Sequence, residues 1–177
     1  MIQFIKLQEE HLEMVMQWRV QPEVSQYMLT DISSDFDKQL QWFQKVSCDE
    51  TYRYWIIVNQ DIPIGVFNLA AIDPENRRCS AGYYIGELQY RSLGAMLPPY
   101  FYNYIFNEMR FHKIYGEVVS GNEKVLKIHQ IHGYQEVGTY RDHLYKNGQY
   151  YDVILIELLA EDWGKLKKYQ RCVAEFA

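Results

Sequence analysis

The sequence predicts an α/β fold with one mixed sheet, which has antiparallel hairpins at both ends, one parallel strand pair in the middle and helices on both faces. Short aromatic and β-branched runs alternate with segments of helical periodicity along the whole chain. A strand, an amphipathic helix and a second strand follow one another over residues 79–119, and such crossovers join parallel strands. Near the C-terminus, Asn147 and Gly148 separate two long strand-like runs, the strongest short signal for a hairpin.

The composition is that of a globular protein with a single core. The chain has 177 residues, of which 48% are hydrophobic and 23% charged. A chain of this length buries about 70% of its unfolded surface, and no linker-like stretch interrupts it, so we expect one domain over residues 1–177. The net charge of -5 disfavours a nucleic-acid partner. No apolar run is long enough for a membrane helix, and the first residues lack a secretory pattern, so we expect a cytoplasmic protein.

The N-terminal segment predicts one strand and two helices. Residues 2–6 have a strand pattern, and residues 12–19 repeat apolar side chains at helical spacing. Pro22 ends this helix or begins the turn after it. Ser34, with Asp37 three residues later, approximates a capping box and predicts the start of a second helix.

The middle of the chain predicts a hairpin and the parallel pair. Residues 52–58 and 64–72 are two strands joined by the turn NQDIP, and residues 79–86 are a third strand. Residues 97–105 place apolar side chains on one face of a helix, and residues 113–119 are the next strand. A parallel pair whose strands diverge forms a natural ligand cleft.

The last third predicts a short helix, a hairpin and a terminal helix. Asn122 caps the short helix and Gly133 closes it. Residues 134–145 and 149–159 flank the Asn-Gly turn, and residues 161–173 are the terminal helix.

Two segments carry residues suited to chemistry. The loop YRSLGAM places Gly94 before a helix, where free amides favour a pyrophosphate, although such glycines also serve purely geometric needs. In the helix NEKVLKIHQIHGY, His129 and His132 lie three residues apart on one face. A metal site is disfavoured, because no further ligands accompany them at metal-binding spacing. Each imidazole is either a buried packing residue or a proton donor at a cleft.

Residues 79–134 resemble the acyl-CoA-binding core of the GNAT superfamily of N-acyltransferases. Arg91 and Gly94 match the loop Q/R-x-x-G-x-G/A, and Asn122, Glu123, Gly133 and Tyr134 match N-E-x-A-x-x-x-Y-x-x-x-G-F. The resemblance implies that acetyl-CoA is the co-substrate and that no metal takes part. The cofactor-binding residues that it implies are Tyr84, Ile85, Gly86, Arg91, Ser92, Leu93, Gly94, Ala95, Met96, Asn122 and Lys124.

Three departures from the family pattern affect this expectation. Met96 stands where a small residue is usual, and Pro98 and Pro99 stand where the helix interior should begin. Either the helix starts near residue 97 or the phosphate loop is reshaped. His129 stands where many members have a tyrosine that protonates the leaving CoA thiolate.

A narrower resemblance suggests the acceptor. WRVQPEVSQYM and RDHLYKNGQYYDV are similar to segments of the N-acetyltransferases of pseudaminic acid biosynthesis, some of which also have His at the position of His129. Those enzymes acetylate the 4-amino group of UDP-4-amino-4,6-dideoxy-N-acetyl-β-L-altrosamine. The substrate-binding residues that this implies are Arg19, Tyr27, Met28 and Asn68, with Arg53, Arg77 and Arg78 as less secure diphosphate ligands.

The expected mechanism is direct attack of the amine on the thioester, because the chain has no nucleophile-elbow motif. Glu117 is the expected base, or else a strand carboxylate on a solvated face. His129 is the expected acid, which requires its imidazolium to persist near neutral pH. A backbone N–H within residues 83–86 would stabilise the oxyanion.

Two other functions remain open at the level of the sequence. An enzyme of the same fold could acetylate a polyamine or a ribosomal-protein N-terminus, and the net charge of -5 suits a cationic acceptor. A non-catalytic acyl-CoA-binding or protein-binding module is the third alternative, for which Met96 and the two prolines are the best argument. Exposed aromatic strand edges could support a homodimer.

Overall fold

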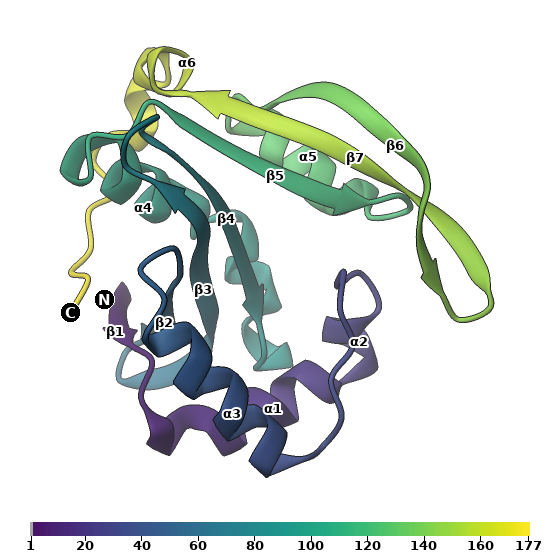
Figure 1. Cartoon of the computed structure of the whole chain (residues 1–177). Helices are drawn as coiled ribbons and strands as arrows, with labels where there is room; N and C mark the ends of the chain where they lie inside the picture. The colour runs from purple at the N-terminus through teal and green to yellow at the C-terminus, as the bar shows by residue number, and fades with distance from the viewer. Residues whose placement is uncertain (1) are drawn as a thin grey trace. The chain divides into compact units, whose positions relative to one another are not determined.

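The computed structural model describes residues 2–177, whose seven strands follow the order β1-β2-β3-β4-β5-β7-β6 (Figure 1). The strands are β1 (Ile2–Lys6), β2 (Arg53–Asn59), β3 (Ile62–Asp73), β4 (Arg78–Ile85), β5 (Lys113–Val119), β6 (Gln135–Lys146) and β7 (Gln149–Leu159). The α-helices are α1 (Leu12–Val20), α2 (Pro22–Ser25), α3 (Phe36–Ser47), α4 (Pro98–Asn103), α5 (Glu123–Ile131) and α6 (Ala160–Lys165). Shorter helical turns are η1 (Glu9–His11), η2 (Leu88–Ala95), η3 (Tyr104–Glu108) and η4 (Lys167–Tyr169).

The chain divides into two compact units. Unit 1 comprises residues 2–72, 81–94 and 174–177, and unit 2 comprises residues 73–80 and 95–173. The parallel pairing joins Arg78, Cys79 and Ser80 of β4 to the start of β5 within unit 2, which confirms the predicted parallel pair. The predicted divergence of these strands beyond that ladder, and the single domain, stay predictions.

In unit 1, side chains from other segments pack on both faces of the antiparallel strands. On one face, Ile56 and Val66 pack with the apolar side of α1, and side chains of α3 complete this cluster. On the other face, Phe67 and Phe4 form an aromatic group with Phe176, whose ring stacks on that of Phe4 at 4.3 Å. The C-terminal residues therefore belong to the core of unit 1.

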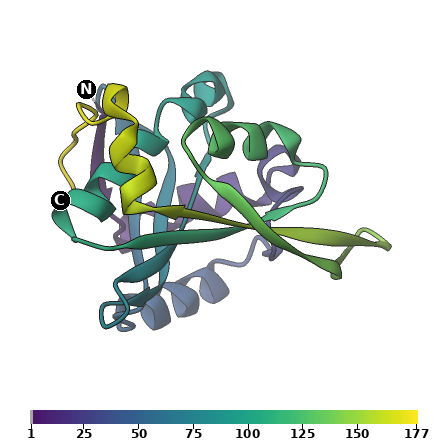
Figure 2. The same ribbon diagram turned by 90° about the horizontal axis from the view of Figure 1, so that it is seen from above.

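Unit 2 is an antiparallel layer of β5, β7 and β6 backed by α5, and its β6–β7 hairpin extends well past that helix (Figure 2). A Cβ on Gly133, at the end of α5, would lie 3.4 Å from the side chain of Leu158. Leu158 pairs with Ile114 of β5, so α5 packs on the sheet face that these two residues share.

Most predicted elements are confirmed within a residue or two, and the hairpin turn has the predicted chemistry. Asn147 and Gly148 have φ values of 51° and 81°, as a type I′ turn requires. Gly133 has φ of 92° and ends α5 as predicted, and the amide of Tyr134 donates to the carbonyl of His129, as in a Schellman motif.

Two sequence predictions about helix ends were wrong. The cap of α3 is Asp35, not Ser34, and its side chain accepts from the Lys38 amide. The terminal helix stops at Lys165 because Leu166 leaves the helical region, and the following residues are bonded to Asn103 of α4. Asn122 is the N-cap residue of α5 as predicted, although its side chain makes no capping bond.

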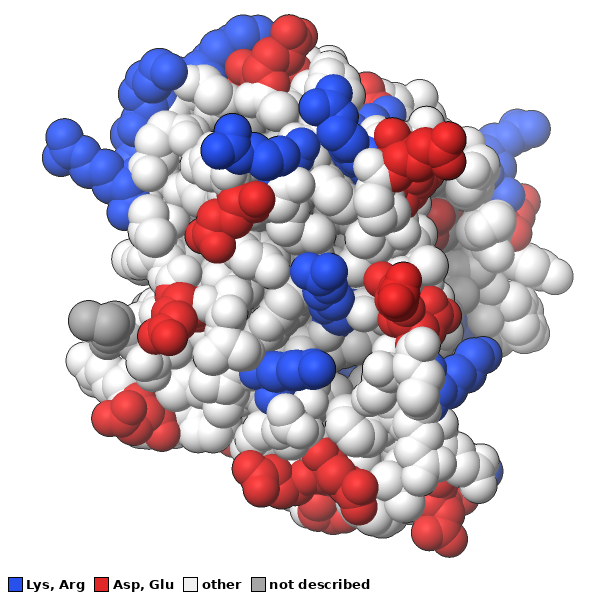
Figure 3. Space-filling view, turned by 60° about the vertical axis from the view of Figure 1, so that its left-hand side comes forward, with Lys and Arg blue, Asp and Glu red and all other residues white. Residues whose placement is uncertain are grey.

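Charged side chains of both signs are interspersed over the face drawn in Figure 3. This face has no continuous basic surface of the kind typical of nucleic-acid-binding proteins. Within residues 2–177, no helix has the length and apolarity needed to cross a membrane.

Candidate active site

The predicted phosphate loop is wound into the turn η2 and is tied to β4. The hydroxyl of Tyr83 donates to the carbonyl of Gly94 at 2.8 Å. Burial raises the pKa of Tyr83, so its hydroxyl stays protonated and able to donate. Arg91, Ser92 and Leu93 lie in the same turn. The loop is therefore held at its end by a side chain from the strand that precedes it.

The end of β4 is shaped by close packing against α1. A Cβ on Gly86 would lie 2.1 Å from ring atoms of Trp18, so only glycine fits there. The Trp18 indole N–H donates to the carboxylate of Glu87 at 2.9 Å. The backbone amides of Gly86 and Glu87 both donate to the carbonyl of Ile64 on β3.

This hydrogen bonding reduces the number of backbone amides that could serve as the expected oxyanion donor. Since the Gly86 amide is already bonded to Ile64, it does not suit the role that the sequence allowed for it. Alternate residues of a strand point their amides to opposite edges, so the Ile85 amide points away from β3. By the same alternation, the Tyr83 amide shares the edge of Ile85 and the Tyr84 amide lies on the edge of Gly86. The oxyanion role of this strand stays a prediction.

The helix that follows the loop begins with its prolines. Pro98 and Pro99 are the first residues of α4, a position where the missing N–H costs nothing. The first of the two alternatives raised by the sequence is thus observed, since the helix starts directly after Leu97. Two of the usual N-terminal amides are absent, so pyrophosphate binding would depend on the amides of the turn before α4.

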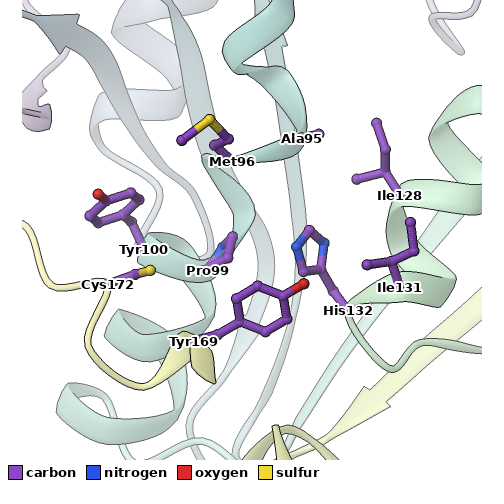
Figure 4. Close-up of a pocket in the computed structure, with 9 residues that line it drawn as sticks. All are labelled: Ala95, Met96, Pro99, Tyr100, Ile128, Ile131, His132, Tyr169 and Cys172. Carbon is purple, nitrogen blue, oxygen red and sulfur yellow. The ribbon is translucent and has the colours of Figure 1, made fainter. Parts of the chain in front are cut away.

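An apolar pocket of about 370 Å³ lies in unit 2, between the start of α4, the helix α5 and the C-terminal segment (Figure 4). Its size is within the range of ordinary ligand pockets. Ala95 and Met96, the last residues of the predicted phosphate loop, form part of its wall. Met96 is 66% exposed and Ile131 is 54% exposed, so the rim of the pocket presents apolar side chains to solvent. The other lining residues are Pro99, Tyr100, Ile128, His132, Tyr169 and Cys172.

His129 is partly buried beside two tyrosines of unit 2. Its Nδ1 lies 3.3 Å from the hydroxyl of Tyr102, and its ring centroid lies 4.7 Å from that of Tyr134. Burial, with a smaller contribution from nearby His132, lowers the pKa of His129 to about 4. At this pKa the imidazole is neutral at pH 7, so the condition for His129 to act as an imidazolium acid is not met. The role of His129 as acid stays a prediction.

His132 belongs to the same aromatic cluster and is only 2% exposed. Burial lowers its pKa to about 4 as well. Its Nδ1 is buried without a hydrogen-bond partner of good geometry among the described residues. His132 is thus a neutral packing residue at the wall of the pocket.

Glu117 and the remaining predicted cofactor residues of unit 2 lie apart from this cluster. Glu117 is exposed, and strand alternation puts it on the sheet face opposite to Ile114 and α5. The carbonyl of Asn122 accepts from the amides of Val125 and Leu126, and Lys124 is exposed at the start of α5. The base role of Glu117 stays a prediction.

Of the predicted substrate residues, Arg19 has the most informative surroundings. Its Nη2 donates to the carbonyl of Thr30 at 3.0 Å and to the Thr30 hydroxyl at 3.2 Å. Its Nη1 is buried without a partner within the described chain. Burial raises the pKa of Tyr54 to about 12, and the positive charge of Arg19 opposes this rise, so the guanidinium lies near that phenol.

The other predicted substrate residues of unit 1 are Tyr27 and Met28, which follow α2, and Asn68 on β3. Tyr27 is 40% exposed after α2, and the amide of Met28 donates to the carbonyl of Ser25. Asn68 on β3 pairs with Tyr54, and its side-chain oxygen would lie 3.0 Å from a Cβ on Gly82. The glycine therefore leaves room for the Asn68 amide above β4.

The three arginines predicted less securely as diphosphate ligands, Arg53, Arg77 and Arg78, have surroundings that differ from those of Arg19. Arg78 forms an ion pair with Asp73 at 3.1 Å, and the carbonyl of Arg77 accepts from the amides of His112 and Lys113. Both lie at the start of β4, whereas the phosphate loop follows its other end. Arg53 is exposed at the start of β2.

In the β6–β7 hairpin, the motif RDHLYKNGQYYDV forms a bulge. The register shifts between Tyr140 and Leu144, and Asp142 has φ of 49°. The carboxylate of Asp152 accepts from the Asp142 amide at 2.9 Å and holds this bulge. Part of the motif is therefore explained by local structure.

Sequence reasoning assigned no role to the side chains of three residues that organise these groups: Tyr83, Trp18 and Tyr102. Trp18 begins the segment WRVQPEVSQYM, but its partners Gly86 and Glu87 are far away in the sequence. Tyr83 and Tyr102 have no distinguishing local pattern. Gly86 packs against the large side chain of Trp18. This complementarity predicts a contact only when β4 and α1 are already known to lie together.

These features define an acyltransferase fold of the kind in which a glycine-bearing loop follows one strand of a parallel pair. The family model described as "Acetyltransferase (GNAT) domain" matches residues 2–135. The chain belongs to the GNAT family, and it is an N-acetyltransferase that uses acetyl-CoA.

Individual relatives agree on the class of reaction. The chain is 25% identical over 127 residues to the acetyltransferase PseH of Campylobacter jejuni, covering 72% of this chain and 78% of that protein. It is 29% identical over 100 residues to the putative ribosomal N-acetyltransferase YdaF of Bacillus subtilis, covering 56% and 55% of the two chains. The spermidine N-acetyltransferase of Vibrio cholerae, solved with CoA and spermine, aligns with a TM-score of 0.85 and 21% identity, covering 92% and 97%. At this identity the structural likeness establishes the fold alone.

Proposed function

We propose that the acceptor is the 4-amino group of a UDP-4-amino sugar, UDP-4-amino-4,6-dideoxy-N-acetyl-β-L-altrosamine, as in pseudaminic acid biosynthesis. The observation that carries this proposal is the buried, unpartnered Nη1 of Arg19. A buried guanidinium nitrogen without a partner is costly, and phosphate oxygens satisfy it with charge-assisted bonds. The likeness to PseH, which extends over 72% of this chain, supports the same acceptor.

A cationic acceptor is less compatible with these surroundings. A polyamine would bring ammonium groups toward the charge of Arg19, which Thr30 holds in place. What favours the polyamine alternative is the overall charge of -5, but this charge acts on long-range steering rather than on the site. The ribosomal-protein alternative rests on the shorter match to YdaF.

In the proposed reaction, the acceptor amine attacks the thioester carbonyl carbon within a ternary complex. The C–N bond forms, the C–S bond breaks, and the products are the N-acetyl sugar and CoA. Glu117 removes the amine proton, directly or through water, and the Ile85 amide stabilises the oxyanion. His129 assists the departure of the thiolate. The loop from Arg91 to Met96 binds the pyrophosphate.

The test is thiol release from acetyl-CoA by the purified protein, measured with the UDP-4-amino sugar, with spermidine and with a peptide bearing a free N-terminus. We expect release with the sugar. Release only with spermidine or the peptide would preserve the enzyme class and refute the acceptor.

A variant then tests the observation behind the proposal. Replacing Arg19 with Ala should raise the KM for the sugar about 10- to 100-fold, the range for a bond to a charged group, and leave the KM for acetyl-CoA nearly unchanged. The control is Arg171→Ala, an exposed arginine in the C-terminal segment. Equal losses for both substrates would indicate a folding defect and would remove Arg19 from sugar binding.

A further inference from the structure

The contact between Tyr102 and His129 links α4 to α5. Tyr102 is 2% exposed, and its hydroxyl lies 3.3 Å from Nδ1 of His129. The two residues are far apart in the sequence, and neither family motif includes Tyr102. A buried hydroxyl at this distance fixes the orientation of the imidazole.

The ring of Tyr102 is itself held rigidly. It packs edge-on against Trp163 with ring centroids 5.2 Å apart and lies 5.5 Å from the ring of Tyr134. The indole N–H of Trp163 donates to the side chain of Asn103 at 2.8 Å.

The next residue of α4 anchors the helix to the C-terminal segment. The amide group of Asn103 donates to the carbonyls of Tyr169 and Cys172 at 2.9 and 2.8 Å. After Asn103 the helix widens into the π turn η3, a feature that often occurs beside functional groups. The position of Tyr102 is thus set by satisfied hydrogen bonds and by close packing on several sides.

We propose that Tyr102 is a positioning residue, whose hydroxyl donates to Nδ1 of His129 and so places the single ring proton of the neutral imidazole on Nε2. This inference rests on the proposed role of His129. The Nε2–H then donates a hydrogen bond to the sulfur as the C–S bond breaks and negative charge develops there. The imidazole keeps its proton. Glu117 takes the proton of the attacking amine and releases it to solvent, and the thiolate takes up one proton from solvent, so the protons balance.

This arrangement agrees with the lowered pKa of the partly buried His129. A neutral imidazole cannot be an imidazolium acid at pH 7, but it donates through one nitrogen when the other accepts. Tyr102 decides which nitrogen carries the proton, much as an outer partner orients a histidine ligand of a metal.

The experiment compares the wild-type protein with Tyr102→Phe, which keeps the ring and removes the hydroxyl. Two-bond ¹H–¹⁵N spectra of ¹⁵N-histidine protein report which nitrogen of His129 is protonated, and His129→Gln assigns the signal. We expect the Nε2–H form in the wild type and a mixture of tautomers in Tyr102→Phe. We also expect kcat to fall about 2- to 10-fold, the factor for one ordinary hydrogen bond, at an unchanged KM for acetyl-CoA.

The control is Tyr145→Phe, which removes a hydroxyl from an exposed tyrosine of the same unit. It should leave the His129 signal and kcat unchanged. An Nδ1–H form in the wild type would overturn the proposal, and so would an unchanged kcat in Tyr102→Phe despite altered tautomers. The rate is measured with whichever acceptor releases thiol fastest, so a wrong sugar assignment leaves this test intact, and the spectra need no substrate.

Discussion

Replacing Gly86 with Ala tests how tightly the end of β4 packs against α1. The new Cβ would lie 2.1 Å from two ring atoms of Trp18 and 2.7 Å from a third. Real contacts of this kind do not occur below about 3 Å, so the indole, which is only 3% exposed, must move. Overpacking of this kind costs about 1–3 kcal/mol. The moved indole would also lose its hydrogen bond to Glu87, which adds about 1 kcal/mol.

The sum, about 2–4 kcal/mol, should lower the Tm by roughly 4–16 °C for a protein of this size. Thermal and urea unfolding of the purified variant measure it. A second variant, Trp18→Leu, removes the ring, and in the double variant the added cost of Gly86→Ala should nearly vanish. The reasoning is refuted if Gly86→Ala alone melts within about 1 °C of the wild type, or if its cost is the same with and without the indole.

Two further predictions concern the loop and the histidines. Tyr83→Phe removes the bond to the Gly94 carbonyl and should raise the Kd for acetyl-CoA roughly 2- to 10-fold in calorimetry with little loss of stability; an unchanged Kd would dissociate the bond from the loop's function. His129 and His132 have folded-state pKa values near 4, below the ordinary value of 6.5, so the unfolded chain binds more protons between these pH values. The free energy of unfolding should therefore fall as the pH drops from about 6.5 to 4, and this part of the fall should disappear in His129→Gln/His132→Leu.

Local sequence patterns were sufficient for most of the fold. The Asn147-Gly148 turn and the Gly133 helix end were predictable because each needs a backbone conformation that few residues adopt. The early end of the terminal helix at Lys165 was not predictable from local sequence. The helical hydrogen bonds lost there are replaced by bonds from Asn103, which is distant in the sequence, to carbonyls of the C-terminal segment. The α3 cap was displaced by one residue because Ser34 and Asp35 are both good capping residues, and local sequence cannot choose between them.

The candidate site also has a part that local sequence predicts and a part that it does not. The loop and the short helix carry recognisable spacing, whereas the groups that support them, such as Tyr83 and Tyr102, come from other elements and leave no local trace. The ionisation of His129 is a further case, because sequence gives only the ordinary pKa of an imidazole and burial is a property of the whole fold.

The neutral state of His129 changes what its substitution for a family tyrosine means. A tyrosine at this position carries a proton on a single oxygen, so its hydroxyl is a donor without further help. A neutral imidazole has two nitrogens and donates from only one, so replacing tyrosine with histidine requires another group to select the donor nitrogen. In this chain the group beside Nδ1 is the buried hydroxyl of Tyr102. A tyrosine in place of His129 would therefore make the Tyr102 hydroxyl dispensable for the rate, and the double variant His129→Tyr/Tyr102→Phe should have the same kcat as His129→Tyr alone.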